Sequence, residues 1–407
     1  MEAYFSSEKE KCRHNTAEPK EASVKKDNER RAESPALLQS LEQVLAQVPD
    51  QRAARGVRYE LLPLLIMVML AKLADADTPL AISDWVAERV DWLREHLQLN
   101  WRRMPHQSTF RRLLQRSLSL PELRQQAQAF LAARQSPQER LCNLDGKTLR
   151  GTIAAEQTKG THLLAIQQAG TNLVLAQTPV GKKENEISAA PGLLKTVDLS
   201  GKIVSGDAMH TQRKLSRQIV RAGGDYLWFV KRNQPALCQQ LVTAFASPAS
   251  RCADAVTVTE YDKGHGRLEK RQLTVSAQVT NMLDWPYATQ GFVLHRTRTV
   301  CRNSKVTEQT VYGITSLEPL ATPPTTLLNL TRQHWNIENG LHYRRDVTFK
   351  EDRCRMKSAH AAECLAIFNN LAIGLLRWLG WDNLARARRH YGAHLMEALQ
   401  VIQGLRP

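Results

Sequence analysis

The sequence predicts an α/β protein: an all-α N-terminal region, then a mixed sheet flanked by helices, with a β-rich insertion in the second half. Three observations predict it. Apolar residues recur three and four positions apart through residues 36–138, the period of an amphipathic helix. From residue 139 three strand-like runs come first, and strands and helices then alternate. Residues 251–322 are polar and strand-like throughout.

The 407-residue chain is strongly basic, with 56 Lys and Arg against 40 Asp and Glu and a formal net charge of +16. Residues 1–35 hold eight residues of each sign, so the excess charge belongs to the rest of the chain. We expect this polar, charge-mixed tail to be disordered. The basic body favours a polyanionic partner, above all nucleic acid, although solubility alone would also explain the charge.

Cysteine usage and apolar patterning predict a cytosolic protein that does not enter a membrane. The seven cysteines are scattered and form no CxxC pair, which is typical of reduced thiols. The chain opens with charged residues instead of a signal peptide. Its longest apolar run, LLPLLIMVMLA at residues 61–71, is too short to span a bilayer and predicts a buried helix.

The helical region 36–138 is the expected DNA-binding region. Its helices are predicted over residues 34–48, 60–74, 81–97, 105–120 and 121–135. No acidic residue lies between residues 96 and 121, where five arginines gather: Arg102, Arg103, Arg111, Arg112 and Arg116. The segment MPHQSTFRRLLQR resembles the entry to a helix-turn-helix, with a Ser/Thr cap before paired arginines. A solvated basic face explains these arginines equally well.

Residues 139–250 predict the first part of a sheet domain. Strands are expected over residues 139–151, 161–170, 172–180, 202–210 and 226–233, and helices over residues 186–197, 211–224 and 235–246. Residues 251–322 would form the β-rich insertion. Residues 323–407 would complete the core with helices, of which residues 361–380 form the strongest amphipathic one.

Two carboxylates follow apolar strands of this sheet. Asp145 follows Leu144 and precedes Gly146, and Asp207 follows Gly206. A carboxylate there is costly to bury unless it meets a metal, a cation or hydrogen-bond donors, and the glycines would let an ion or a substrate approach. The alternative is an aspartate that only caps the next element.

A third carboxylate would turn two strand-end aspartates into a site for two Mg²⁺ ions, since hard cations prefer oxygen ligands. Glu338 is the candidate. On a helix, His334, Glu338 and His342 recur every four residues and share one face. A zinc site is one alternative, although the spacing is not HExxH; a surface glutamate between two histidines is the other.

At these residues the chain becomes recognisable. The pieces are LDGKTLRGT (144–152), KKENEI (182–187), GDAMHTQ (206–212), DYLWFVKRNQP (225–235), HGRLEKR (265–271), ITSLEP (314–319) and RQHWNIENGLHYRRDVTFKEDRCR (332–355). Each is weak alone, but their order and separations are specific. Over residues 40–400 the chain resembles the DDE transposases of bacterial insertion sequences, in particular the H-repeat-associated proteins.

The resemblance implies an RNase H-like catalytic core in which Asp145, Asp207 and Glu338 are the catalytic, metal-binding triad. It implies two Mg²⁺ ions, replaceable by Mn²⁺, that support cleavage of DNA at element ends and strand transfer into a target. The partners would be double-stranded DNA, as terminal inverted repeats and target, and a second copy of the chain on paired ends. The location would be the bacterial cytosol, in association with the nucleoid.

The resemblance also selects DNA-contacting residues near the triad: Lys147, Lys231, Asn233, His334 and Arg345. Relatives often carry Tyr, Arg and Lys where this chain has Thr331, His334 and Arg345, so these contacts differ here. The polar stretch after residue 230 could instead be a plain strand-to-helix turn. Trp335 could stack on a base or belong to the core. The rival functions are a DNA-binding protein without cleavage, and a nuclease of the same fold that does not transpose.

Overall fold

The computed structural model describes residues 38–405, apart from residues 56, 157, 182, 247–251 and 265. The tail expected at residues 1–35 lies outside the described residues. From Gln39 onward the chain forms one compact unit, so the N-terminal helices and the sheet belong to the same body.

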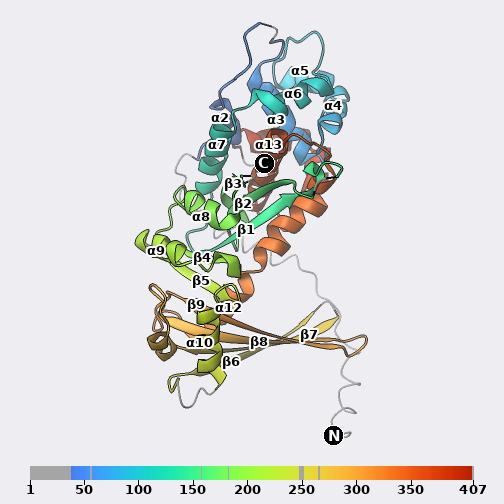
Figure 1. Ribbon diagram of the computed structural model, residues 1–407. Helices are drawn as coiled ribbons and strands as arrows, with labels where there is room; N and C mark the ends of the chain where they lie inside the picture. The colour runs from blue at the N-terminus through green and yellow to red at the C-terminus, as the bar shows by residue number, and fades with distance from the viewer. Residues whose placement is uncertain are drawn as a thin grey trace, which may run out of the picture. The chain divides into compact units, whose positions relative to one another are not determined.

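A nine-stranded mixed sheet runs through this unit in the order β3-β2-β1-β4-β5-β9-β8-β7-β6 (Figure 1). Its strands are β1 (Leu141–Leu149), β2 (Thr161–Gln168), β3 (Leu173–Val180), β4 (Ile203–Gly206), β5 (Asp225–Val230), β6 (Val256–Gly264), β7 (Arg267–Ser276), β8 (Gln290–Val300) and β9 (Val306–Thr315). Strands β1, β4 and β5 are parallel to one another, and the remaining pairs are antiparallel.

The helices before the sheet are α2 (Leu41–Ala46), α3 (Leu61–Leu73), α4 (Pro79–Ala87), α5 (Val90–His96), α6 (Gln107–Arg112), the π-helical η1 (Leu113–Ser117) and α7 (Leu120–Ala132). Helices α8 (Glu186–Leu194), α9 (Arg213–Arg221) and α10 (Pro235–Ala246) connect strands, and η3 (Ala208–His210) and η4 (Gln278–Met282) are short 3-10 turns. The last part holds α12 (Pro324–Gln333), η5 (Ile337–His342), η6 (Arg344–Thr348), η7 (Glu351–Arg353), α13 (Ala359–Trp378), α14 (Leu384–Ala393) and α15 (Leu395–Ile402).

The predicted insertion does not form a separate sheet. Strand β9 pairs with β5 through Trp228 and Ile314, so the strands of the insertion extend the sheet that carries the aspartates. In Figure 1 this extension, in yellow and orange, lies beyond β5, on the far side from β1. The continuous backbone hydrogen bonding across β5 and β9 holds the extension in a fixed relation to the central strands.

Helix α13 forms the centre of the core and is buried from Ala361 to Leu376. It packs against α7, α3 and β3. Its length and apolar composition would also suit a membrane span, but 89% of its most apolar window is buried inside the protein. We therefore interpret α13 as the central helix of a packed core, as its amphipathic pattern predicts.

The local sequence explains where the helices begin. Helix α2 starts at a capping box formed by Ser40 and Gln43. Helix α3 is buried on all sides from Leu64 to Leu73, and every residue of that stretch except Lys72 is apolar. Helix α8 starts at the Asn185 cap, whose side chain accepts from the Ser188 amide, and this cap fixes the position of Glu186 on the first turn.

The helix expected around Glu338 has a different form. Helix α12 ends at Gln333, and residues 337–342 and 344–348 form two π-helical segments. A π-helix has hydrogen bonds between residues five apart, is rare, and frequently occurs at functional sites. The four-residue period expected for His334, Glu338 and His342 therefore does not apply, and the three side chains make different contacts.

A buried ionic network ties the π-helical segments to the core. Arg345 is 1% exposed, and its guanidinium donates to Glu351 over 2.8 Å and to Gln177 over 3.2 Å. The other carboxylate oxygen of Glu351 accepts from Asn369, which in turn accepts from the ammonium of Lys72 on α3. A buried charge must be paired in this way because an unpaired one is expensive.

This network predicts a large stability loss when one partner is removed. Glu351→Ala leaves the buried Arg345 guanidinium without its counter-charge, and we expect a loss of about 3–5 kcal/mol in the free energy of unfolding. Glu88→Ala is the control, because that carboxylate forms an exposed pair with Arg89 and should matter little. Urea unfolding followed by circular dichroism measures both. Equal stability of the two variants would contradict the account.

Candidate functional site

Asp145 and Asp207 lie side by side because β1 and β4 run parallel in a defined register. Leu144 pairs with Gly206, so the two aspartates follow at the same level of neighbouring strands. The sequence suggested that Asp145 lies at the end of its strand, but the structure differs. Asp145 lies within β1, at the point where β4 ends and β1 continues alone beside β2.

Negative charge accumulates around Asp145. Burial, together with the charges of Asp207, Glu186 and Glu338, raises the pKa of this carboxyl to about 7, against one hydrogen bond from the Gly146 amide. Glu338 is exposed, yet its charge reaches Asp145 from η5. These carboxylates form an oxygen-only donor set with too few cations to balance it, which fits a divalent cation.

His334 positions Asp207. Its Nε2 lies 3.4 Å from the carboxylate of Asp207, and its Nδ1 lies 2.9 Å from the hydroxyl of Ser205. The hydrogen bond from His334 lowers the pKa of Asp207 despite the carboxyl's partial burial, and the charge of Lys231 acts in the same direction. His334 is 4% exposed and packs against Phe229, so it does not reach DNA as expected; it orients a carboxylate instead.

His342 contacts the other aspartate. Its Nδ1 lies 3.5 Å from a carboxylate oxygen of Asp145. Burial, together with the charges of Arg345 and Lys147, lowers the pKa of His342 to about 3. The imidazole is therefore neutral at physiological pH, and its contact with Asp145 is not an ion pair.

Glu186 is a fourth carboxylate near Asp145; in the sequence it belongs to the KKENEI motif that resembles the family, and it is also the first residue of a predicted helix. It is hydrogen-bonded to Nε2 of His162 over 2.9 Å and to Nε2 of the buried His210 over 3.1 Å. Burial opposes its charge, but these two histidines outweigh that cost and lower its pKa to about 2. A side chain on Gly146 would collide with Glu186, since a Cβ there would lie 2.3 Å from the carboxylate. The KKENEI motif at residues 182–187 is the sequence feature that could have placed Glu186 at the site.

Two expected DNA contacts are paired inside the protein. Lys147 is 8% exposed and forms an ion pair with Asp346, and Arg345 is engaged by Glu351 and Gln177. Neither cation faces a surface that a DNA phosphate could reach. We therefore exclude both from the DNA interface.

Lys231 and Asn233 occupy the turn after β5, next to the segment that follows Asp207. Lys231 is exposed, and Asn233 donates to the carbonyl of Ala208 over 2.6 Å. Gln234 similarly donates to the carbonyl of Thr211. These bonds hold the turn against the segment after Asp207, and exposed Lys231 and Asn233 both remain candidates for a contact with DNA beside Asp207.

The N-terminal arginines divide into two groups. Arg103, Arg112 and Arg116 line a cavity of about 810 Å³, together with Arg52, Arg55 and Arg58, which sequence reasoning missed. The run QRAARGVRY at residues 51–59 is the sequence feature that could have predicted these three additional arginines. Arg102 and Arg111 are exposed but do not line this cavity.

Helices α5 and α6 do not form the helix-turn-helix expected at residues 104–116, which stays a prediction for α6, η1 and α7. Ten residues, 97–106, separate α5 from α6, where the motif would have a turn of about 3–4 residues. Helix α6 then continues directly into the π-helical η1.

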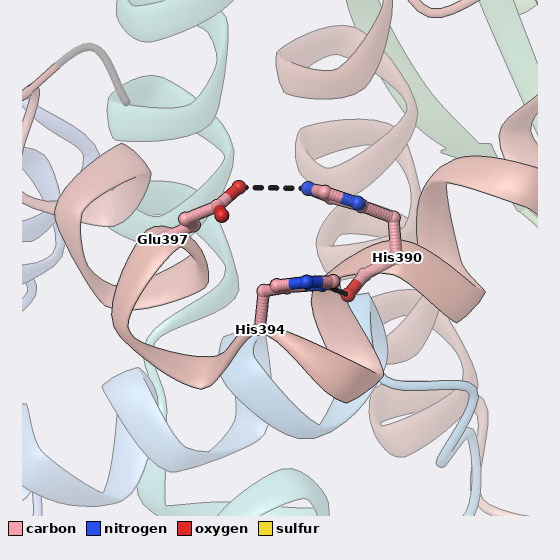
Figure 2. A group of neighbouring side chains, drawn as sticks. All are labelled: His390, His394 and Glu397. Atoms are coloured by element: carbon pink, nitrogen blue, oxygen red, sulfur yellow. Dashed lines mark hydrogen bonds and ion pairs between the residues drawn. The ribbon is translucent and has the colours of Figure 1, made fainter.

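A second group of potential metal ligands lies in the C-terminal helices (Figure 2). His390, His394 and Glu397 have ligand atoms that all lie within 4.8 Å of one another. Nε2 of His390 lies 2.7 Å from Glu397, and His394 Nδ1 bonds to the carbonyl of His390. These contacts fasten α14 to α15. By contrast, in the described part of the chain the carboxylate oxygens of Asp145, Asp207 and Glu338 do not all lie within 4.8 Å of one another.

Comparisons with known proteins show the family of the chain. Residues 136–375 match the family model described as transposase DDE domain, and residues 42–131 match the one described as DDE_Tnp_1-associated. The transposase DDE domain model covers more than half of the chain. Both aspartates, Glu186 and Glu338 fall inside it.

Several relatives share most of their length with the chain. "Putative protein YbfL" of Escherichia coli strain K12 is 28% identical over 83% of this chain and 90% of its own length. "H repeat-associated putative transposase YhhI" of the same strain is 27% identical with the same coverage. A solved structure of piggyBac transposase in a synaptic complex with hairpin DNA covers 88% of this chain and 76% of its own, with a TM-score of 0.44 and 12% identity.

Glu186 allows a test of the site's hydrogen bonding. Glu186→Ala leaves the buried His210 without its acceptor, and we expect a loss of about 1–3 kcal/mol in the free energy of unfolding at pH 7. Because the folded pKa is about 2, against an ordinary value of 4.5, this contribution is complete above pH 4.5 and declines as the pH falls toward 2.

Urea unfolding of wild type and variant at pH 6.5 and pH 3 measures the difference. Glu184→Ala is the matched control, since that exposed carboxylate only accepts from the Gly181 amide. A Glu186→Ala loss that is equal at both pH values would show that the charge of Glu186 does not carry the effect.

Proposed function

This chain is an insertion-sequence DNA transposase of the DDE family, and we propose that Asp145, Asp207 and Glu338 form its catalytic site. The observation that carries the assignment is the register of β1 and β4, which sets two aspartates side by side. The charge of Glu338 also acts on Asp145. The strand order β3-β2-β1-β4-β5 supports an RNase H-like core, in which the first two carboxylates come from adjacent parallel strands.

We propose that the three carboxylates hold two Mg²⁺ ions, which Mn²⁺ can replace. Their all-oxygen donor set suits hard cations, and their mutual repulsion favours binding of positive charge. Bound cations would activate the attacking water or 3′-hydroxyl and stabilise the leaving oxygen of the phosphodiester.

The surrounding side chains of this chain act on the carboxylates. His334 and Ser205 hold Asp207 in one orientation, and neutral His342 contacts Asp145 without adding charge. Glu186, fixed by His162 and His210, contributes further negative charge beside Asp145. Lys231 is exposed, and its positive charge lowers the pKa of Asp207. It would bind a phosphate flanking the scissile bond.

We propose that the arginines around the N-terminal cavity, Arg103, Arg112 and Arg116, contact backbone phosphates of the terminal inverted repeats of the element without enclosing the duplex. Guanidinium groups supply salt-dependent affinity for phosphates. The target DNA would approach the carboxylates, and two copies of the chain would act on paired ends in the bacterial cytosol. A DNA-binding protein without cleavage is not favoured, because the family's three carboxylates are all present.

Removal of one triad carboxylate tests the site. We expect Asp145→Asn to reduce Mg²⁺-dependent cleavage of the element's own ends by at least about a hundredfold, because the bound cations would lose a ligand. Binding to the same ends, measured by gel shift, should remain. Cleavage by this variant at the wild-type rate would contradict the assignment. A wild-type protein that binds ends but never nicks them would favour the binding-only alternative.

The N-terminal cavity predicts a difference between two sets of arginines. Alanine at Arg103, Arg112 and Arg116 should weaken binding to element ends and lower the salt slope of the association constant by about 0.9 for each phosphate that is no longer neutralised. Alanine at Arg102 and Arg111, which lie outside the cavity, is the matched control. Equal losses of affinity from both sets, measured by fluorescence anisotropy between about 50 and 200 mM salt, would indicate a diffuse basic surface instead.

A further inference from the structure

The corner between helices α14 and α15 brings together two histidines and a glutamate that the candidate catalytic site does not use (Figure 2). His390 lies in the last turn of α14, Glu397 lies in the first turn of α15, and His394 lies between the two helices. One ligand atom of each residue lies within 4.8 Å of those of the other two. In the described part of the chain, no other three His, Cys, Asp or Glu side chains form so compact a group.

The backbone of the corner fixes the spacing of these side chains. Helix α14 ends at Ala393 and α15 begins at Leu395, and His394 between them has the non-helical angles φ −118° and ψ 73°. His390 and His394 lie four residues apart, and their rings stack with centroids 4.3 Å apart. The turn at His394 directs the chain back, so that the carboxylate of Glu397 lies 2.7 Å from Nε2 of His390. A short local segment thus presents all three side chains from rigid helix ends.

The hydrogen bonding of His394 leaves one of its ring nitrogens suited to a metal. Nδ1 of His394 lies 2.8 Å from the backbone carbonyl oxygen of His390. Because a carbonyl only accepts, Nδ1 carries the proton and Nε2 of the neutral ring keeps its lone pair. A carbonyl bonded to the second ring nitrogen is the usual support of a metal-binding histidine. His394 is exposed, so a cation reaches this ring from solvent.

Pairing between the two helices explains only part of this arrangement. His390 and Glu397 bond to each other, and each suits its helix end, because basic residues favour a helix C-terminus and acidic ones an N-terminus. His394 serves neither purpose. Its side chain makes no capping hydrogen bond to α15, and its ring would repel that of His390 if both were protonated. A metal ion accounts for the second imidazole, since both rings then donate a nitrogen lone pair to it.

The donor set selects the class of cation. Two imidazole nitrogens and one carboxylate oxygen suit Zn²⁺ and neighbouring transition metals, whereas Mg²⁺ prefers the all-oxygen set around Asp145. Two ligand atoms on a tetrahedral zinc stand about 3.3 Å apart, so the contact between His390 and Glu397 must open by about 0.6 Å. The neutral ring of His390 then carries its proton on Nδ1. Three protein ligands leave the fourth position of the zinc to water.

We propose that His390, His394 and Glu397 bind one Zn²⁺ ion that joins α14 to α15. Both helices pack against α3. Helix α14 also carries the buried Arg388, which donates to the carbonyl of Thr348 in η6. The ion therefore stabilises a corner of the core, and it does so apart from the carboxylates of the proposed catalytic site. The proposal does not depend on the proposed function.

Calorimetric titration of the untagged full chain with Zn²⁺, in buffer that contains an excess of Mg²⁺, tests the proposal. We expect Glu397→Gln and His394→Asn each to weaken Zn²⁺ binding at least about tenfold, because the loss of even an outer partner of a metal ligand has an effect of that size. His394→Asn keeps a favourable residue at the start of α15, so the corner itself should remain.

His96→Ala is the matched control. Nδ1 of His96 also bonds to a carbonyl four residues earlier, that of Trp92, but His96 belongs to no such group of ligands. Zn²⁺ at about a hundredfold excess over its dissociation constant should raise the Tm of wild type and of His96→Ala by a few degrees, and it should leave the Tm of the other two variants nearly unchanged. Wild-type Zn²⁺ affinity in both ligand variants would overturn the proposal, and so would an equal loss of affinity in His96→Ala.

Histidine modification of the wild-type protein covers the case in which the variants do not fold. Diethyl pyrocarbonate modifies accessible imidazoles, and peptide mapping locates the modified residues. We expect Zn²⁺ to protect the peptide that contains His390 and His394. Protection confined to other peptides, such as the one that contains His162, would refute a zinc site at this corner.

Discussion

The parallel pairing of β1 with β4 determines where the proposed chemistry would occur. Leu144 lies opposite Gly206, so the next residue on each strand is an aspartate at the same level of the sheet. A shift of one residue in this register would turn one of the two carboxylates to the other face. The other contacts of the site either keep these two charges close together or compensate for the repulsion between them.

Different groups act on the two aspartates to offset the repulsion between their charges. Asp207 is stabilised as an anion by His334 and the charge of Lys231, whereas Asp145 is partly buried among three other carboxylates and has a raised pKa. The π-helical segment η6, which follows the segment that carries Glu338, is anchored by Arg345 through Glu351 and Asn369 to the core helices. The arginine that resembled a DNA contact in sequence thus supports the segment next to the one that carries the third carboxylate.

The sequence predicted the two aspartates, the mixed sheet and the central helix α13 because each follows from a local pattern. It could not reveal that β9 pairs with β5, since strand pairing across many residues leaves no local mark. It assumed an α-helical period around Glu338, but the chain adopts π-helical segments there. Burial of Lys147 and Arg345 also escaped it, because their partners, Asp346 and Glu351, identify themselves only when the fold brings them near.

The central claim is that Asp145, Asp207 and Glu338, from three distant segments, form one divalent-cation site. Iron(II) in place of magnesium, with ascorbate and peroxide, cuts a protein backbone next to a bound metal and so maps its ligands directly. The account predicts cuts around residues 145, 207 and 338 that excess Mg²⁺ suppresses. Cuts confined to the segment with His390, His394 and Glu397 would contradict it.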